Sequence, residues 1–332
     1  MGPVDDRIMW DIWASIYGMP SLTAADALGL FACLEEGPKS QQQLCQLLAL
    51  EKRPLEVLAG YLCAAGFLDR EAESYALTPV ARTYLLPASP YYWGGFFRQI
   101  RDWPVTHDAM LKALRQNQPT VTEEEVFALT GDSTDLAARF TRAMHAVTLG
   151  PAEAAAKCPD FEGVEHLLDV GGGSGNFSIA LASAWPRIKC TVLELPSVCP
   201  IVAEYVSGKD FNDRVKTHAC DFFADPWPAG QDAVLFGNIF HNWGHEQCMN
   251  LAQKAYASLP TGGQIFLHEM LLDDTGNGPP TVAANSLVMM FNHHGRQRSA
   301  KELSQLLQKA GFAATKVRST FGYFSLVRAR KP

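Results

Sequence analysis

Positive charge is scarce in this sequence, and the basic residues that are present are dispersed. Among 332 residues there are 28 lysines and arginines against 35 aspartates and glutamates, which gives a formal net charge of −7. The densest basic group is Arg328-Ala-Arg330-Lys331, close to the C-terminus. Because proteins bind the phosphates of nucleic acids through clustered lysine and arginine, the composition argues against nucleic acid as the main partner.

Long hydrophobic runs and targeting signals are also lacking. No apolar run reaches the roughly 18 residues that a membrane-spanning helix requires. The first residues, MGPVDDRIMWD, are acidic and have no signal-peptide profile. Asp6 stands where an N-myristoylation signal carries serine or threonine. We therefore expect a soluble, cytoplasmic protein that does not bind a membrane.

Cysteine motifs are absent as well. The eight cysteines (33, 45, 63, 158, 190, 199, 220 and 248) are scattered, and none of them falls in C-x-x-C spacing. Several lie inside apolar runs, which is typical of reduced, buried thiols rather than of a metal site. With 47% apolar residues the chain can form a sizeable core, and its length predicts two domains or one large domain.

The stretch from His166 to Pro196 contains the strongest pattern in the chain. An apolar run ends at Asp169 and Val170, and a glycine-rich turn follows over 171–175. Apolar residues then recur at helical spacing over 177–184, and a second apolar run ends at Glu194. A strand, a tight glycine turn, a helix and a strand that ends in an acid form half of a nucleotide-binding α/β fold.

A glycine-rich turn of this kind fits NAD, FAD or S-adenosylmethionine, and it also occurs as a structural turn without a ligand. Asp169 distinguishes among the ligands because it stands two residues before the first glycine, Gly171. A carboxylate there repels a pyrophosphate but attracts an ammonium or a sulfonium. The sequence thus favours S-adenosylmethionine, with Glu194 placed to bind the ribose hydroxyls.

Polar residues recur at the ends of the expected parallel strands. Further strands are expected over 214–219, 232–236 and 264–268, a helix over 246–259, a helix capped by Ser299 that runs to Ala310, and two closing strands over 313–317 and 323–327. In parallel sheets, functional residues gather at the carboxyl ends of the strands. Five polar residues fall at or just past such ends: Asp169, Glu194, Asp221, His241 and Glu269.

The N-terminal part, residues 1–95, is expected to form a separate domain. Aromatic and aliphatic residues recur at helical spacing over 6–36, which indicates either ordinary core or a surface buried against another subunit. A capping box at Ser40 begins a helix, a second helix follows over 55–67, and a hairpin is expected over 67–77 before a helix that begins at Thr78-Pro79. Such an order is typical of a winged helix, but its second helix is apolar, which favours protein contacts over DNA binding.

Residues 96–332 are expected to form the second domain. Its first part, 96–157, is helical and aromatic in composition, and it contains another capping box at Thr122-x-x-Glu125. We interpret 96–157 as a helical linker that lines the substrate cleft.

Taken in order, these segments resemble one family. LLDVGGGSG, VLELP, CDFF, IFHNWGHEQC and the Gly-Arg-Gln-Arg-Ser segment at 295–299 are similar to the class I S-adenosylmethionine-dependent O-methyltransferases of the caffeate, hydroxyindole and polyketide branch. The resemblance covers essentially the whole chain. It implies an α/β fold with a seven-stranded doubly wound methyltransferase domain behind an all-α winged-helix dimerisation domain. It also implies a homodimer in which the N-terminal domains are swapped.

The resemblance assigns the cofactor site residue by residue. Gly171 and Gly173 correspond to the turn against the methionine part, Glu194 to the ribose acid, and Asp221 and Phe222 to the adenine contacts. The positions that the resemblance assigns to S-adenosylmethionine and its product S-adenosylhomocysteine are Thr148, Asp169, Gly171, Gly173, Glu194, Leu195, Asp221, Phe222, Asn238 and Trp243. No metal is implied.

The resemblance also assigns a catalytic base, His241. A phenol, with a pKa near ~10, is a poor nucleophile until it loses its proton, and an imidazole can accept that proton near neutral pH. Glu269 corresponds to the carboxylate that orients this histidine. The family's second orienting glutamate falls on Gln297, and an aspartate that commonly follows the base falls on Asn242. Gln297 retains hydrogen bonding but not charge.

The acceptor pocket is expected from methionines, aromatics and polar residues in two segments, whose alternative role is plain core. These positions are Met144, His145, Met290, Phe291, Asn292 and His294. The main hypothesis is therefore an O-methyltransferase that acts on a hydroxyl of an aromatic or polyketide-like small molecule. A lyase or cyclase that binds S-adenosylmethionine without transferring its methyl group, and a winged-helix DNA-binding regulator, are the alternatives.

Overall fold

The computed structural model describes residues 4–101, 105–120 and 133–332, without the side chains of 133–136. Two units divide the chain, Met1–Trp103 and Pro104–Pro332. The capping box expected at Thr122-x-x-Glu125 lies outside the described residues. The sequence-based boundary between 95 and 96 and the cleft-lining role of 96–157 remain predictions.

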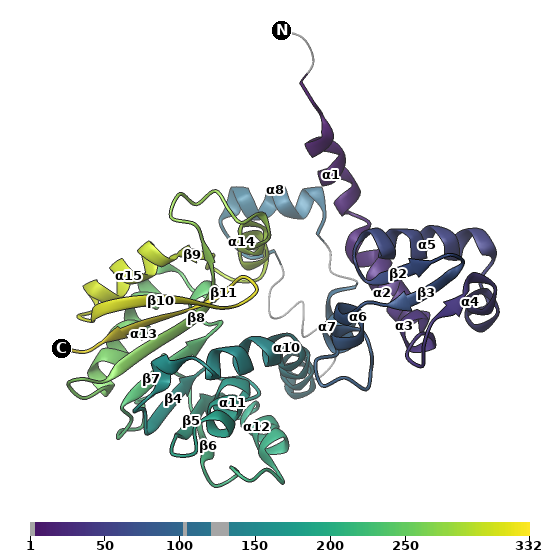
Figure 1. Cartoon of the computed structure of the whole chain (residues 1–332). Helices are drawn as coiled ribbons and strands as arrows, with labels where there is room; N and C mark the ends of the chain where they lie inside the picture. The colour runs from purple at the N-terminus through teal and green to yellow at the C-terminus, as the bar shows by residue number, and fades with distance from the viewer. Residues whose placement is uncertain (1–3, 102–104, 121–132) are drawn as a thin grey trace. The chain divides into compact units, whose positions relative to one another are not determined.

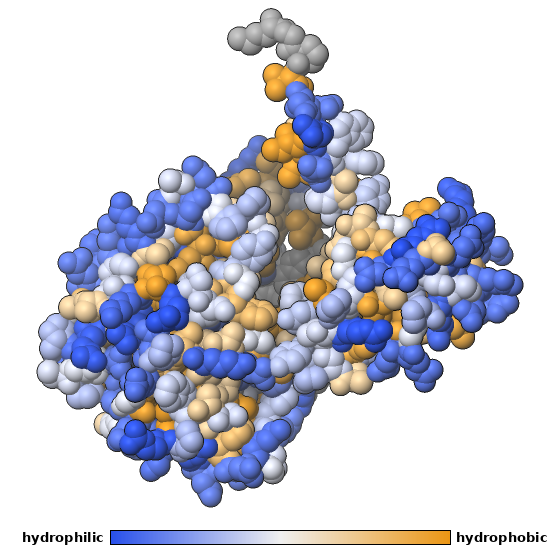
Figure 2. All heavy atoms as spheres, in the orientation of Figure 1, coloured by the Kyte–Doolittle hydropathy of each residue, from blue (hydrophilic) through white to orange (hydrophobic). Residues whose placement is uncertain are grey.

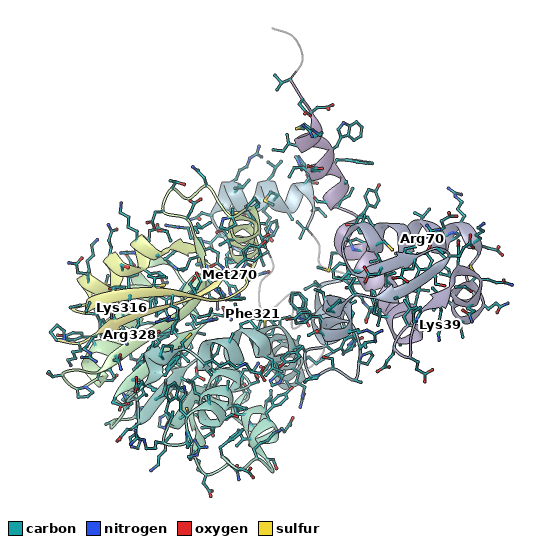
Figure 3. All side chains as sticks on the ribbon, viewed as in Figure 1. Lys39, Arg70, Met270, Lys316, Phe321 and Arg328 are labelled. Carbon is teal, nitrogen blue, oxygen red and sulfur yellow. The ribbon has the colours of Figure 1, made fainter. Side chains whose placement is uncertain are left out.

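The N-terminal unit is mainly helical and contains a small antiparallel sheet in the order β1-β3-β2. The outer strands carry Lys39 and Arg70 (Figure 3). Its elements are α1 (Arg7–Ser15), α2 (Gly18–Ala27), α3 (Leu30–Cys33), β1 (Lys39–Ser40), α4 (Gln41–Leu48), α5 (Lys52–Ala64), β2 (Leu68–Glu71), β3 (Ser74–Leu77), α6 (Pro79–Tyr84) and α7 (Gly94–Ile100). The expected pair of helices and hairpin is confirmed, whereas strand β1 has no counterpart in the sequence-based prediction.

Two helix starts in this unit follow directly from local side-chain chemistry. The Ser40 hydroxyl accepts a hydrogen bond from the Gln43 amide, and the Gln43 side chain accepts one from the Ser40 amide. Thr78 caps α6 in the same way, with Pro79 at the first helical position. Both predictions are confirmed. Helix α5 instead begins at Lys52, three residues earlier than expected, because proline is tolerated in a first helical turn.

Helix α1 buries none of its residues within this chain. Trp10 is 59% exposed and Trp13 is 56% exposed, although the two indoles pack edge to face on one another. Apolar side chains are visible along this helix (Figure 2). The alternative that residues 6–36 form ordinary core is therefore wrong for 6–16 in the isolated chain, whereas Ala25, Leu30 and Phe31 do lie in the core. The aromatic surface of α1 stays open to a partner.

The C-terminal unit contains the expected doubly wound sheet, in the order β10-β11-β8-β7-β4-β5-β6. Strands β4 to β8 pair in parallel, and β11 pairs antiparallel with β8 and with β10. A short eighth strand, β9, pairs with the end of β8. The strands are β4 (His166–Val170), β5 (Lys189–Glu194), β6 (Val215–Ala219), β7 (Ala233–Gly237), β8 (Gln264–Leu272), β9 (Arg298–Ser299), β10 (Ala313–Phe321) and β11 (Phe324–Arg330).

Helices cover both faces of this sheet because successive strand residues point to opposite sides. On β7, Val234 and Phe236 pack in one core cluster with helices α13 and α15, whereas Ala233 and Leu235 pack in the other with α10, α11 and α12 (Figure 1). The helices of this unit are α8 (His107–Gln116), α10 (Ser133–Ala156), α11 (Asn176–Ala184), α12 (Cys199–Val206), α13 (His245–Ser258), α14 (Pro280–Asn292) and α15 (Ala300–Lys309).

Two helices of this unit, α12 and α14, were not anticipated from the sequence, and β8 continues past the expected end at 268. All eight cysteines are free, as expected. Within the described ranges, no helix combines the length and the apolar character needed to cross a membrane.

Candidate active site

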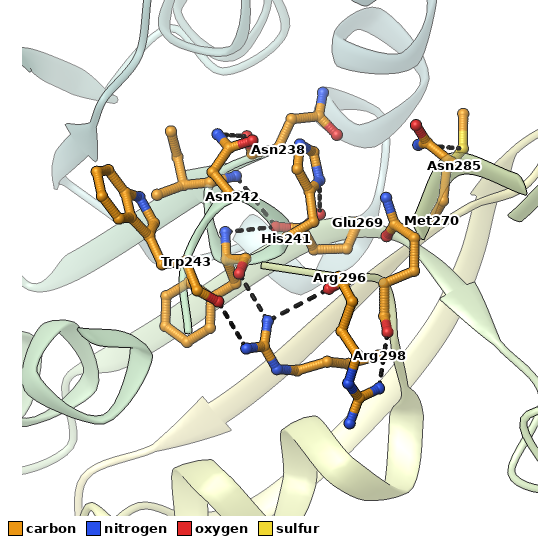
Figure 4. A network of polar contacts seen from close by, with 12 residues as sticks. Asn238, His241, Asn242, Trp243, Glu269, Met270, Asn285, Arg296 and Arg298 are labelled. Atoms are coloured by element: carbon orange, nitrogen blue, oxygen red, sulfur yellow. Dashed lines mark hydrogen bonds and ion pairs between the residues drawn. The ribbon is translucent and has the colours of Figure 1, made fainter. Parts of the chain in front are cut away.

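His241 lies in a short 3-10 turn, Phe240–Asn242, between β7 and α13. Its Nδ1 lies 2.6 Å from Oε2 of Glu269, which is 2% exposed on the neighbouring strand β8. The other carboxylate oxygen of Glu269 accepts hydrogen bonds from the amides of Ile239 and Phe240, at 3.0 and 2.8 Å. One carboxylate therefore holds both the imidazole and the backbone that leads to it (Figure 4).

Asn238, at the end of β7, adopts a left-handed backbone conformation with φ of 60°. Its amide donates to the carbonyl of His268, and its carbonyl accepts from the Asn242 side chain at 3.4 Å. Asparagine tolerates this conformation better than most residues, and such strained positions concentrate at functional sites. The turn therefore redirects the chain from the sheet into the His241 loop, immediately beside the expected cofactor site.

The glycine turn after β4 requires glycine for two different reasons. Gly171 and Gly173 have φ of 67° and 58°, which residues with a side chain rarely adopt. Gly172 lacks space instead, because a Cβ there would lie 2.7 Å from Cγ of Asp169 and 2.9 Å from Cγ1 of Val192. A Cβ on Gly173 would meet nothing within 4 Å, so one side of the turn is open.

Asp169 is fully buried beneath this turn. One carboxylate oxygen accepts a hydrogen bond from the Ser178 hydroxyl at 2.7 Å, and the other has no partner among the described residues. Burial raises the pKa of Asp169 to about 6, with a smaller contribution from the charge of Glu194. The sequence-based prediction that this carboxylate favours a cationic ligand stays a prediction.

Glu194, at the end of β5, reaches back to the same turn. Its carboxylate accepts hydrogen bonds from the amides of Gly173 at 3.1 Å and of Leu195 at 2.8 Å. Burial raises the pKa of Glu194, and these two amides oppose the rise. Leu195 beside it is 48% exposed. The structure thus brings the expected ribose acid to the glycine turn.

The loop after β6 brings the expected adenine contacts to the His241 loop. Phe222 packs edge-on against Trp243 with ring centres 6.1 Å apart, and it also lies against Gly171, where a Cβ would be 3.5 Å from its ring. The Asp221 carboxylate accepts hydrogen bonds from the amides of Phe223 and Ala224 within its own loop. The Trp243 indole nitrogen is buried without a partner in the described residues.

Helix α10 places two predicted residues beside the start of α11. The Thr148 hydroxyl accepts a hydrogen bond from the side chain of Asn176 at 2.8 Å. The Nδ1 of His145 lies 2.9 Å from the Ser174 hydroxyl, and its ring stacks on Tyr205 at 3.7 Å. Burial lowers the pKa of His145 to about 4, so the ring is neutral at physiological pH.

The remaining predicted acceptor residues differ in exposure. Met144 and Met290 are half-buried, Phe291 is 3% exposed, and His294 is exposed. The side-chain oxygen of Asn292 is buried without a partner in the described residues. No contact with an acceptor tests these residues, so their role remains a prediction.

The sequence-based analysis did not single out His293, which ends α14. Burial lowers the pKa of His293 to about 4, and the neighbouring His241 and His294 lower it further. The only local signal was its position between the predicted Asn292 and His294.

Gln297 lies with His241 and Glu269 around one small internal space. The side chain is 1% exposed, and neither its amide nitrogen nor its amide oxygen has a hydrogen-bond partner among the described residues. An unsatisfied buried amide is costly, because its donor and acceptor lose their hydrogen bonds to water without replacement. The catalytic role assigned to Gln297 stays a prediction.

Comparisons with known proteins identify the family. A model of the O-methyltransferase domain matches residues 104–313, which is more than half of the chain, and a model of the O-methyltransferase dimerisation domain matches residues 10–87. This chain belongs to the O-methyltransferase family. This methyltransferase is thus an enzyme that transfers a methyl group, as the sequence motifs predicted.

Relatives of this methyltransferase align over nearly its whole length. The 3-hydroxy-5-methyl-1-naphthoate 3-O-methyltransferase of Streptomyces sahachiroi is 32% identical, with 92% of this chain and 88% of that protein covered. The acetylserotonin O-methyltransferase of Bos taurus is 29% identical, with 93% of each chain covered. A solved structure of human N-acetylserotonin methyltransferase with S-adenosylmethionine matches with a TM-score of 0.82 at 25% identity, covering 100% of this chain and 99% of that one.

The methyl donor of this methyltransferase is S-adenosylmethionine, and the residues at the carboxyl edge of its sheet fit that molecule. The open side of Gly173 leaves room for close approach. The indole nitrogen of Trp243 and the side-chain oxygen of Asn176 are buried and unpartnered within the described part of the chain, as expected of groups that a ligand satisfies. Among the described residues, no group of three or more His, Cys, Asp or Glu side chains is placed to hold a metal.

Proposed function

We propose that this methyltransferase methylates a hydroxyl group of an aromatic or polyketide-like small molecule, with His241 as the general base. The observation that carries the proposal is the arrangement of Glu269 around the His241 loop. Two backbone amides donate to one oxygen of Glu269, while Nδ1 of His241 lies 2.6 Å from the other. The named substrates of the relatives, a hydroxynaphthoate and acetylserotonin, support the acceptor class.

This arrangement determines which nitrogen of His241 acts. A carboxylate that already accepts two amide hydrogen bonds is an acceptor, so Nδ1 of the imidazole carries the proton and donates it to Glu269. Nε2 then presents a lone pair, which is what a general base requires. The buried carboxylate also stabilises the imidazolium that forms when the ring takes the acceptor's proton.

The donor supplies, when bound, an electrophilic methyl group on a positively charged sulfur. The chain's own residues hold and orient it: the turn at Gly171 and Gly173 beside the methionine part, Glu194 and Leu195 at the ribose, Asp221 and Phe222 at the adenine. Asp169, Thr148, Asn238 and Trp243 complete the proposed donor site. Alignment of oxygen, carbon and sulfur by this framework is a proximity effect, which requires no further catalytic group.

The acceptor is proposed to lie beside α14 and the adjoining part of α10. Met144, Met290 and Phe291 would provide the apolar surface for a flat ring, and Asn292 and His294 would provide polar contacts. Gln297 and His145 complete the proposed set. His293, whose pKa burial lowers to about 4, follows the proposed Asn292 and precedes the proposed His294, and we add it to the set.

The N-terminal unit is proposed to mediate a homodimer in the cytoplasm. The dimerisation-domain match covers 10–87, and the exposed aromatic face of α1 provides apolar surface of the kind that interfaces bury. The helix pair α4 and α5 with the hairpin β2–β3 supports a winged-helix description of this unit.

His241→Ala and His241→Gln test the function directly. A panel of hydroxynaphthoates and N-acetylserotonin serves as acceptors, and release of S-adenosylhomocysteine is measured at saturating donor. Both variants are expected to lose at least about 10²-fold in kcat because general-base catalysis contributes that much, while donor binding by calorimetry stays within about twofold. Retained turnover in either variant would disprove the role of His241. Acceptor conversion without release of S-adenosylhomocysteine would instead support the lyase or cyclase alternative.

A further inference from the structure

We propose that Arg298 is a positioning residue that fixes the backbone of the His241 loop. The inference rests on the proposed function, because it assumes that His241 is the base. In the sequence, the Gly-Arg-Gln-Arg-Ser segment at 295–299 is recognisable only as a family motif that contains Gln297. The structure shows that two other residues of this segment, Arg298 and Gly295, contact the backbone of the His241 loop.

The guanidinium group of Arg298 spans the His241 loop from below (Figure 4). Nη1 donates to the carbonyl of Phe240 at 2.6 Å, and Nη2 donates to the carbonyl of Trp243 at 2.7 Å. These carbonyls stand one residue before and two residues after His241. Because both bonds end on backbone, they fix the path of the loop whatever the side chain of His241 does.

Arg298 is buried, with 7% of its surface exposed, and its hydrogen-bond partners among the described residues are all backbone carbonyls. The described carboxylates form no ion pair with it within 4.0 Å. A buried cation that forms no ion pair costs stability unless its donors are satisfied, and here the carbonyls of Phe240 and Trp243 satisfy them. A lysine could not reproduce this arrangement, because its single ammonium lacks the planar fork that reaches two carbonyls at once.

Gly295 provides a second, independent contact with the same loop. A Cβ built on Gly295 would lie 2.0 Å from the carbonyl oxygen of His241 and 2.5 Å from the backbone of Asn242 and Trp243. The segment and the loop are therefore packed backbone against backbone. Arg298 begins strand β9 and pairs with Leu271 on β8, the strand that carries Glu269. The His241 loop, Glu269 and Arg298 are thus all held by strand β8.

The chemical consequence concerns orientation rather than binding. Glu269 fixes one end of the imidazole, but the direction of Nε2 also depends on where the loop backbone lies. A displacement of about 1 Å in a catalytic group can reduce the rate by about 10²-fold. Arg298 is therefore expected to affect kcat far more than donor affinity, because its bond to the Trp243 carbonyl reaches only one of the proposed donor contacts directly.

A double-mutant cycle tests this inference. Arg298→Met is combined with His241→Ala, and kcat is measured as release of S-adenosylhomocysteine with the fastest acceptor of the panel. Arg298→Met alone is expected to lower kcat by about 10²-fold, with a much smaller rise in donor Kd through the loosened Trp243. In the His241→Ala background the same change is expected to cost less than about threefold, because residues that act through one group are not additive. Arg298→Lys is expected to fall between Arg298→Met and the parent.

Arg214 provides a matched control. Its guanidinium also donates to three backbone carbonyls, those of Ala182, Trp185 and Ile188, at the amino-terminal ends of the strands and away from His241. Arg214→Met is expected to lower the melting temperature but to keep kcat within about twofold at a temperature where the protein is folded. Comparison of the two variants separates a general loss of stability from a loss of positioning.

Hydrogen exchange provides a measurement that does not depend on turnover. In Arg298→Met or Arg298→Lys, whichever is folded, amides over 238–248 are expected to exchange at least about tenfold faster than in the parent, and not in Arg214→Met. Unchanged exchange there, a kcat within twofold of the parent, or an additive double-mutant cycle would each overturn the inference. Retained activity in His241→Ala alone would instead overturn the proposed function.

Discussion

Replacement of Asp169 by asparagine is expected to stabilise the protein at neutral pH and to weaken donor binding. The carboxyl is fully buried, and burial raises its pKa from 3.8 to about 6. Folding therefore favours the protonated form of the Asp169 carboxyl. The stability that this raised pKa contributes is present below pH 3.8 and is lost as the pH rises through about 6. Above that pH the native protein carries a buried carboxylate that costs about 3 kcal/mol.

The asparagine side chain keeps an oxygen that can accept the hydrogen bond from the Ser178 hydroxyl. Unlike aspartate, this side chain never ionises. The free energy of unfolding of Asp169→Asn, relative to the parent, is therefore expected to increase with pH. About 1.5 kcal/mol of this increase should fall between pH 5 and pH 8. Each kcal/mol corresponds to roughly 2–4 °C in melting temperature. Thermal unfolding of the donor-free protein, followed by tryptophan fluorescence at both pH values, measures it.

Although the free energy of unfolding increases in Asp169→Asn, the affinity of this variant for S-adenosylmethionine should decrease. The negative charge of Asp169 attracts the positive charge of the donor, so Kd for S-adenosylmethionine is expected to rise about tenfold in Asp169→Asn. Ser178→Ala is the control, because it keeps the carboxylate but removes its hydroxyl partner. This variant should be destabilised more at pH 8 than at pH 5. A pH-independent stability change in Asp169→Asn, together with unchanged donor affinity, would refute the reasoning.

Three further predictions concern other parts of the site and the proposed dimer. In Glu269→Gln an uncharged amide replaces the carboxylate that binds two backbone amides and His241. The kcat is therefore expected to fall at least about 10²-fold in the same turnover assay, with donor Kd unchanged. Gly172→Ala should lower the melting temperature through its contacts with Asp169 and Val192, whereas Gly173→Ala should cost about 1–2 kcal/mol of backbone strain and mainly raise donor Kd by calorimetry. Trp13→Asp on α1 should shift the protein to monomer in light scattering, and an unchanged mass would contradict the proposed dimer surface.

Local features of the structure could be predicted well from the sequence. The capping boxes at Ser40 and Ser299, and the cap at Thr78, depend on side chains within three residues of the backbone groups they satisfy. The order of strands and helices from 166 to 194 follows from apolar periodicity and glycine placement, which are also local. His241 and Glu269 were each predicted at or just past the end of a parallel strand, where functional residues gather, and the family resemblance implied that Glu269 orients the histidine.

The contacts that complete the site depend on tertiary structure. The fork of Arg298 on the His241 loop joins residues 55 and 58 positions apart, and the contact of His145 with Ser174 joins residues 29 positions apart. Neither periodicity nor spacing encodes such contacts, because they depend on how buried elements pack together.

The sequence by itself determined the family, the glycine turn and the acids and histidine at the strand ends, since each follows from short-range chemistry along the chain. Only the tertiary structure decided that Asp169 is buried, that Gln297 has no partner among the described residues, and that Arg298 and Gly295 contact the catalytic loop. The physical reason is that burial and hydrogen-bond satisfaction are properties of the packed interior, where residues distant in sequence compete for the same space.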